Sequence, residues 1–127
     1  MNVVDSSGWI EYFADEKNAD FFAEPIEQTD FLIVPTISVY EVFKHVLRER
    51  NHAEALDAIA YMEQCRVVDL NTSLAIEAAS TSHRLKIPMA DSIILTTARV
   101  YGAELWSQDA DFEGIDGVRY IQKNTFE

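Results

Sequence analysis

Short apolar segments alternate with amphipathic helical patterns along the chain, and this alternation restricts the possible folds more than any other feature of the sequence. The run Phe31-Leu32-Ile33-Val34 is continuously apolar, which is typical of parallel strands that are covered on both faces. Strands that alternate with helices predict an α/β fold with a mainly parallel sheet flanked by helices. The predicted strands cover residues 2–5, 31–35, 66–70, 104–107 and 118–121.

Amphipathic patterns fill the segments between these strands. Ala55, Ile59 and Met62, for example, lie three or four residues apart and would form one face of a helix. Pro25 disfavours the later half of the second helix, because proline removes a backbone hydrogen bond. The predicted helices cover about residues 6–13, 18–28, 36–50, 53–64, 71–85 and 89–101.

Length and composition favour one globular domain. The chain has 127 residues, 48% of them apolar, and no linker or repeat divides it, so we expect a single domain over residues 1–127. The only cysteine, Cys65, excludes an internal disulfide and any multi-cysteine metal site, and it indicates a reducing compartment such as the cytoplasm. No basic residue precedes an apolar stretch at the N-terminus, and the apolar runs are too short to cross a bilayer, so we expect neither secretion nor membrane insertion.

The charge balance narrows the possible partners. Asp and Glu number 22 and Lys and Arg number 10, which gives a net charge of −12. Such a field repels nucleic acid as a whole and attracts metal ions and basic polypeptides. An enzyme that acts on nucleic acid would therefore need a local strip of basic residues to bind it. Its acidic residues would need a function that explains why they cluster.

Several acids stand at positions where a ligand site is expected. Asp5 ends the first predicted strand, and Asp109 and Asp111 follow the fourth, so they would lie at the same edge of a parallel sheet, where ligands bind. Glu41 and Asp91 interrupt stretches that are otherwise apolar. Carboxylates in such surroundings need a partner or a metal ion.

Each acid taken alone also has a structural explanation. Asp5 could cap a helix, Asp91 could interact with a helix dipole, and Asp109 and Asp111 could shape a turn. Glu41 is the hardest to explain in this way, because it lies within a helix whose first half has few other polar residues. Together, four acids at these element ends favour a divalent-metal site over coincidence.

These segments resemble the PIN-domain ribonucleases, and most closely the VapC-like toxins of toxin–antitoxin pairs. The resemblance covers nearly the whole chain and rests on four motifs. They are Val3-Val4-Asp5-Ser6-Ser7, Glu41 in the third helix, Ala90-Asp91 at the start of the sixth helix, and Ser107-Gln108-Asp109-Ala110-Asp111-Phe112. The last two motifs are the more specific. The resemblance implies a small domain with a parallel five-stranded sheet, an acidic quartet that binds Mg²⁺ or Mn²⁺, and endonucleolytic cleavage of RNA.

By position, the resemblance implies specific site residues. The catalytic quartet would be Asp5, Glu41, Asp91 and Asp109, with Asp5, Asp91 and Asp109 as the metal ligands. Ser6 and Ser107 would be supporting hydroxyls, and Ser107 stands where the family commonly has threonine. Asp111 also lies near the fourth position; we favour Asp109 there and count Asp111 as supporting, and the choice between them is left open at this point. The resemblance further implies a homodimer and an antitoxin partner with a basic segment.

The chemistry agrees with the residue types. Carboxylate oxygens suit Mg²⁺ or Mn²⁺, whereas His45, His52 and His83 are not spaced as a zinc site. A bound divalent ion can activate water and neutralise charge on the phosphate, so no Ser-His or Cys-His nucleophile is required.

Basic residues that could contact RNA follow Glu41 directly. Lys44 and Arg48 are four residues apart and share one helix face, and Arg50 follows them. These three are candidates for a phosphate track toward the metal. An ordinary solvated helix face, paired with Glu49 and other acids, explains the same residues equally well.

Other functional classes fit less well. A receiver domain needs an acidic pair at the first strand, where Asp5 stands alone, and a haloacid-dehalogenase-type phosphatase needs its Asp-x-Asp after the first strand rather than the fourth. The stronger alternative is a catalytically silent PIN-like scaffold that binds a protein or nucleic-acid partner. Retention of all four acids argues against it.

Overall fold

The computed structural model describes residues 1–123 and contains a five-stranded sheet in the order β3-β2-β1-β4-β5. All neighbouring strands are parallel, which confirms the predicted α/β class. The strands are β1 (Asn2–Val4), β2 (Leu32–Pro35), β3 (Arg66–Val68), β4 (Glu104–Ser107) and β5 (Val118–Tyr120). The last residues of the predicted domain, 124–127, lie outside the described part of the chain.

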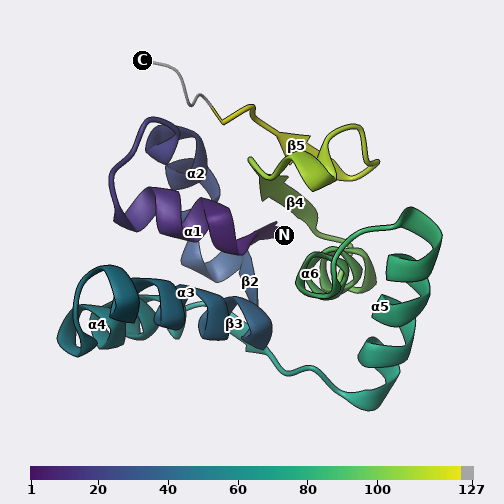
Figure 1. The fold of residues 1–127 in the computed structure, drawn as a ribbon, viewed down its shortest axis with the longest axis horizontal. Coiled ribbons are helices and arrows are strands. Elements are labelled where there is room, and N and C mark those ends of the chain that lie inside the picture. Colours follow the sequence, from purple (N-terminus) through teal and green to yellow (C-terminus); the bar gives the residue numbers. More distant parts are fainter. Residues whose placement is uncertain (124–127) are drawn as a thin grey trace.

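Within residues 1–123, six α-helices flank the sheet (Figure 1). They are α1 (Ser6–Phe13), α2 (Ala19–Ile26), α3 (Thr36–Glu49), α4 (His52–Met62), α5 (Thr72–Leu85) and α6 (Met89–Val100). Two short 3-10 helices, η1 (Thr29–Phe31) and η2 (Ala110–Phe112), precede β2 and follow β4. None of the helices in residues 1–123 is long and apolar enough to cross a membrane.

Alternate strand residues enter two separate cores. Val4 and Trp106 pack with residues of α1 to α4, whereas Val3 and Leu105 pack with residues of α6. Because successive side chains of a strand point to opposite faces, both faces of the sheet are covered. This double coverage explains why the strand segments are apolar without alternation.

Most predicted elements start or end one or two residues away from their observed bounds, and three of these differences have a visible cause. β2 starts one residue later than expected, because residues 29–31 form η1 and leave Phe31 56% exposed. β3 ends at Val68, at the edge of the sheet, with Leu70 exposed. α2 ends at Ile26 rather than near Gln28, and Gln28 N donates to Pro25 O in a tighter turn.

The strand order brings the segment after β1 and the segment after β4 to the same end of the sheet. β1 lies between β2 and β4, and the chain passes from the β1-β2-β3 side to the β4-β5 side. The order therefore reverses between β1 and β4, where the crevice of an open α/β sheet forms. The residues that follow β1 and β4 meet at that crevice.

Candidate metal centre

A cavity of about 360 Å³ opens at the carboxyl ends of β1 and β4. Acidic residues reach it from separate elements: Asp5 from the end of β1, Glu41 from α3, Asp91 from the first turn of α6, and Asp109 from the segment after β4. The structure therefore brings together the four acids that the sequence separates widely.

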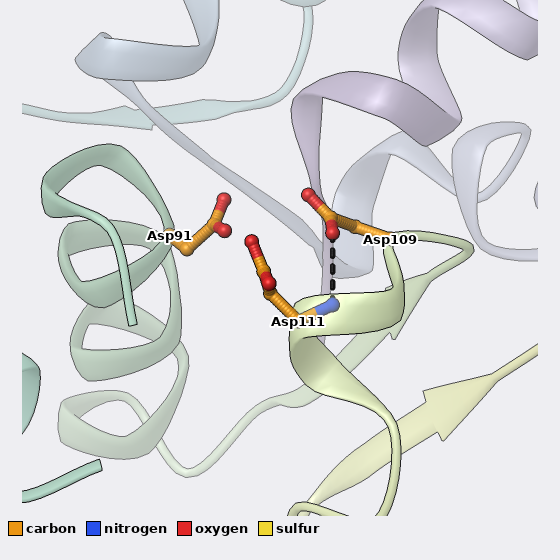
Figure 2. A group of neighbouring side chains, drawn as sticks. All are labelled: Asp91, Asp109 and Asp111. Atoms are coloured by element: carbon orange, nitrogen blue, oxygen red, sulfur yellow. Dashed lines mark hydrogen bonds between the residues drawn. The ribbon is translucent and has the colours of Figure 1, made fainter. Parts of the chain in front are cut away.

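Three carboxylates form the tightest group in this region. Asp91, Asp109 and Asp111 each offer an oxygen, and these oxygens lie within 4.8 Å of one another. Figure 2 shows Asp91 pointing from α6 toward the two acids of the segment after β4, where Asp111 N donates a 2.9 Å hydrogen bond to Asp109 Oδ1. Asp109 and Asp111 therefore lie side by side, and Asp111 belongs to the cluster as closely as Asp109 does.

Asp91 carries the largest electrostatic cost in the cluster. The pKa of Asp91 is raised to about 8, mainly by partial burial and then by repulsion from Asp109, a hydrogen-bonding contact with Asp111, and the charges of Asp111 and Asp5. A carboxylate in this environment retains its proton unless a cation compensates the charge. Oxygen donors at this spacing fit a hard divalent cation such as Mg²⁺ or Mn²⁺.

Asp5 lies next to this group and is held by the protein itself. It is 2% exposed, and its oxygens accept hydrogen bonds from Ser7 Oγ, Gly8 N and Ser107 Oγ. Burial nevertheless raises the pKa of Asp5 to about 6, against the lowering effect of these donors, and Asp109 contributes repulsion. Asp5 is thus both the cap of α1 and an electrostatic member of the acidic site.

The predicted supporting hydroxyls take two separate tasks. Ser6 Oγ donates a 2.6 Å hydrogen bond to Glu41 Oε1, which links α1 to α3. Ser107 Oγ donates 2.7 Å to Asp5 Oδ2 and accepts from Asp109 N at 2.9 Å. A single hydroxyl therefore connects the acids that follow β1 and β4.

The basic candidates separate in space. Lys44 and Arg48 line the acidic cavity, whereas Arg50 lines a different, larger cavity of about 660 Å³. Arg48 also lies 3.3 Å from Glu49 in an exposed ion pair, so the solvated-face interpretation applies to it as well.

Sequence reasoning missed three polar residues around the site. Ser7 donates to both carboxylate oxygens of Asp5. Gln108, the residue before Asp109, and Glu11 are buried and hydrogen-bonded to each other. The signal for Glu11 was its position among the apolar residues of α1, the same signal that marked Glu41. Gln108 carried a weaker one, since it lies between two site residues at the end of a strand.

Comparisons with known proteins agree with this fold. A family model described as PIN domain matches residues 3–118, and comparison with curated proteins gives no match. A chain of a toxin–antitoxin complex from Klebsiella pneumoniae is 21% identical with a TM-score of 0.78, covering 94% of this chain and 96% of that chain.

Two further solved structures are similar over nearly their full length. VapC20 of Mycobacterium tuberculosis, described as a sarcin-ricin loop cleaving toxin, is 17% identical with a TM-score of 0.77, covering 91% of this chain and 95% of that chain. A chain of the DNA-bound VapBC from Salmonella typhimurium is 16% identical with a TM-score of 0.72, covering 96% of this chain and 98% of that chain. At these identities the likeness establishes a common fold.

Proposed function

The chain belongs to the PIN domain family, and from this premise we propose that it is a divalent-metal-dependent endoribonuclease, the toxin of a type II toxin–antitoxin pair. The observation that carries the proposal is the cluster of Asp91, Asp109 and Asp111 carboxylates at the carboxyl ends of β1 and β4. A silent scaffold would have no need to retain carboxylates that repel one another.

Each residue then has a defined task. Asp91, Asp109 and Asp111 would hold Mg²⁺ or Mn²⁺, with Asp5, which lines the same cavity as Asp91 and Asp109, as the further ligand that the sequence predicts. When bound, the ion would lower the pKa of a water molecule and neutralise charge on the scissile phosphate. Glu41, oriented by Ser6, would accept a hydrogen bond from the attacking water.

The basic face of α3 would position the RNA. Lys44 and Arg48 line the same cavity as the acids, so their side chains would hold phosphates next to the metal. These contacts would offset the repulsion between RNA and a chain with a net charge of −12.

RNA cleavage with and without metal tests the proposal. Purified protein is incubated with matched single-stranded RNA, structured RNA and DNA, with Mg²⁺, Mn²⁺ or EDTA. We expect cleavage of RNA in Mg²⁺ or Mn²⁺, none in EDTA, and none by Asp91→Asn in any buffer. Cleavage that persists in EDTA, or equal cleavage by Asp91→Asn, would reject the nuclease assignment.

We propose in addition that a basic antitoxin segment occupies the site. Apolar and aromatic side chains, among them Phe13, Val46 and Tyr61, line the larger cavity, and Ile10 and His45 line both cavities. Exposed acids surround it, namely Glu16, Glu49, Glu54 and Asp57. An Arg or Lys side chain that reaches the neighbouring acidic cavity would block both metal and RNA.

The proposed assembly is a cytoplasmic homodimer bound by antitoxin. Similar solved structures described as toxin–antitoxin or VapBC complexes support the partner. Light scattering after size-exclusion chromatography tests the dimer, and a monomer at micromolar concentration would reject it.

A further inference from the structure

A buried polar cluster lies behind the acidic segment that follows β4. Gln108 is 4% exposed and Glu11, on α1, is 6% exposed. Gln108 Nε2 donates to Glu11 Oε1 at 3.1 Å. A buried amide and a buried carboxylate are costly unless hydrogen-bonded, so this pair is fixed in one arrangement.

Gln108 connects the segment after β4 to α1 and to the start of α2. In the first turn of α1, Ser7 O accepts a hydrogen bond from Nε2 at 3.4 Å. Asn18, the residue before α2, donates from Nδ2 to Gln108 Oε1 at 2.9 Å and from its backbone N to Glu11 Oε2 at 2.9 Å. Both the amide nitrogen and the amide oxygen of the Gln108 side chain are therefore hydrogen-bonded.

The neighbours of Gln108 in sequence point to the metal centre. Ser107 Oγ contacts Asp5, and the Asp109 carboxylate contributes to the cluster with Asp91 and Asp111. Ser107 and Asp109 thus face the acidic residues, whereas Gln108 between them faces Glu11, as expected for side chains that alternate along extended backbone. Because its hydrogen bonds hold Gln108 in the protein interior, the side chain of the next residue, Asp109, is directed toward the acidic site.

We propose that Gln108 and Glu11 are positioning residues that hold Asp109 and Asp111 at the spacing a divalent cation requires. This inference rests on the proposed function, because it assigns these residues to the metal site of that reaction. Residues that orient metal ligands typically change metal affinity or activity by about 10–100-fold when they are replaced.

Mn²⁺ affinity, measured by titration calorimetry on folded protein, is the first test. We expect Gln108→Leu to weaken Mn²⁺ binding by about tenfold or more. The matched control is Ser82→Ala, which removes the 2.7 Å hydrogen bond from Ser82 Oγ to Ile87 O at the far end of α5 and should leave Mn²⁺ affinity unchanged. If Gln108→Leu does not fold, Gln108→Asn, whose shorter amide cannot reach Glu11, replaces it with the same expectation.

A reciprocal exchange separates position from charge. Gln108→Glu adds a negative charge next to Asp109, which by charge alone would strengthen cation binding, but it also sets two carboxylates against each other at the 3.1 Å contact. We expect weaker Mn²⁺ binding from this variant. The double variant Glu11→Gln/Gln108→Glu exchanges amide and carboxylate, restores a hydrogen bond between the two positions, and should recover affinity to within about threefold of the parent.

Hydrogen exchange in metal-free protein gives a readout that needs no cation. The Asp109 and Asp111 amides donate to Ser107 Oγ and Asp109 Oδ1, and we expect Gln108→Leu to increase their exchange rates about tenfold while the amides of α5 stay unchanged.

These measurements distinguish the two proposals. A parent that binds no Mn²⁺ would reject the proposed function, and hydrogen exchange would then decide the positioning role alone. If Mn²⁺ affinity and amide exchange in Gln108→Leu match the parent, or if the double variant binds no better than Gln108→Glu, the positioning role is wrong.

Discussion

At the scale of single residues, the site contains two aspartates that the protein treats differently. Asp5 is surrounded by donors, yet burial raises its pKa to about 6. Asp91 faces other carboxylates, and burial together with Asp109 and Asp111 raises its pKa to about 8. Both shifts mean that the ionised, metal-free site opposes folding, because the unfolded chain releases these protons more easily.

The upward direction of the Asp91 pKa shift predicts how Asp91→Asn changes stability. The pKa of Asp91 rises from 3.8 to about 8 on folding, so its contribution lowers the free energy of unfolding progressively from about pH 4 to about pH 8. At pH 7 most of this penalty is present, and we expect Asp91→Asn to raise the metal-free Tm by about 3 °C or more. At pH 4 most of this gain should disappear, because the carboxyl is then protonated in the folded state and close to half protonated in the unfolded state, where its pKa is 3.8.

Scanning calorimetry of the metal-free proteins at both pH values checks the prediction. Saturating Mn²⁺ should stabilise the parent by mass action, about 2.7 kcal/mol at a hundred times Kd, and should stabilise Asp91→Asn far less. A metal-free Asp91→Asn that melts clearly below the parent at pH 7 would instead make Asp91 a structural residue of the first turn of α6.

At the scale of elements, α1 and α3 set the walls of the site. Asp5 caps α1, and α1 packs closely against β1 and α2 because residue 8 is glycine. A Cβ at Gly8 would lie 2.6 Å from Phe22 and 2.7 Å from Val4. α3 presents Glu41, Lys44 and Arg48 to one cavity, since residues three, four and seven apart share a helix face.

Gly8→Ala tests the close approach of α1. Helix propensity alone predicts stabilisation by about 1 kcal/mol, whereas the contacts with Phe22 and Val4 predict a loss of about 1–3 kcal/mol. We expect the loss, together with weaker Mn²⁺ binding, because a displaced α1 moves Asp5 and Ser7. Urea unfolding decides between the two, and a stabilised variant would show that α1 can shift at little cost.

The basic face of α3 gives a matched test of RNA contact. Lys44 and Arg48 line the acidic cavity and Arg50 does not. In an Asp91→Asn background, which prevents cleavage, we expect Lys44→Ala and Arg48→Ala each to weaken RNA binding several-fold and to lower the salt slope by about 0.7. Fluorescence anisotropy at several salt concentrations measures both. If Arg50→Ala, the control, weakens binding as much as the other two, the proposed phosphate track is wrong.

At the scale of the whole molecule, the net charge of −12 opposes binding of the proposed RNA substrate and favours the proposed basic protein partner. Two adjoining cavities offer binding sites for such a partner, because one is lined by the proposed catalytic acids and the other by apolar side chains and exposed acids. Affinity for a basic segment should therefore contain a large electrostatic part.

Salt dependence tests the proposed antitoxin complex. Co-expression with the adjacent reading frame should yield an inactive complex, and the Debye length falls from about 10 Å at 0.1 M salt to about 3 Å at 1 M. We expect the Kd of the complex to weaken at least tenfold over this range. Affinity that is independent of salt would indicate that apolar contacts alone hold the partner, and failure to co-purify would remove the antitoxin assignment while sparing the nuclease.

The sequence by itself determined the fold class, most elements and the acids worth testing. Continuous apolar segments such as residues 32–34 require cover on both faces, which leaves a parallel sheet with helices between the strands. Local rules failed only at element ends, as at Phe31 and Leu70, where exposure depends on what packs nearby. Resemblance of the motifs around Asp5, Asp91 and Asp109 predicted the PIN domain, and the family model that matches residues 3–118 confirms it.

Only the tertiary structure decided how these residues act together. It placed Asp111 in the tight cluster beside Asp91 and Asp109, separated Arg50 from Lys44 and Arg48, and revealed Gln108 and Glu11 behind the acidic segment. None of this is local information, since Gln108 and Glu11 lie 97 positions apart in the chain. The pKa of a carboxyl and the position of a ligand depend on the charges and donors within a few ångströms, and those neighbours are set by the packing of distant elements.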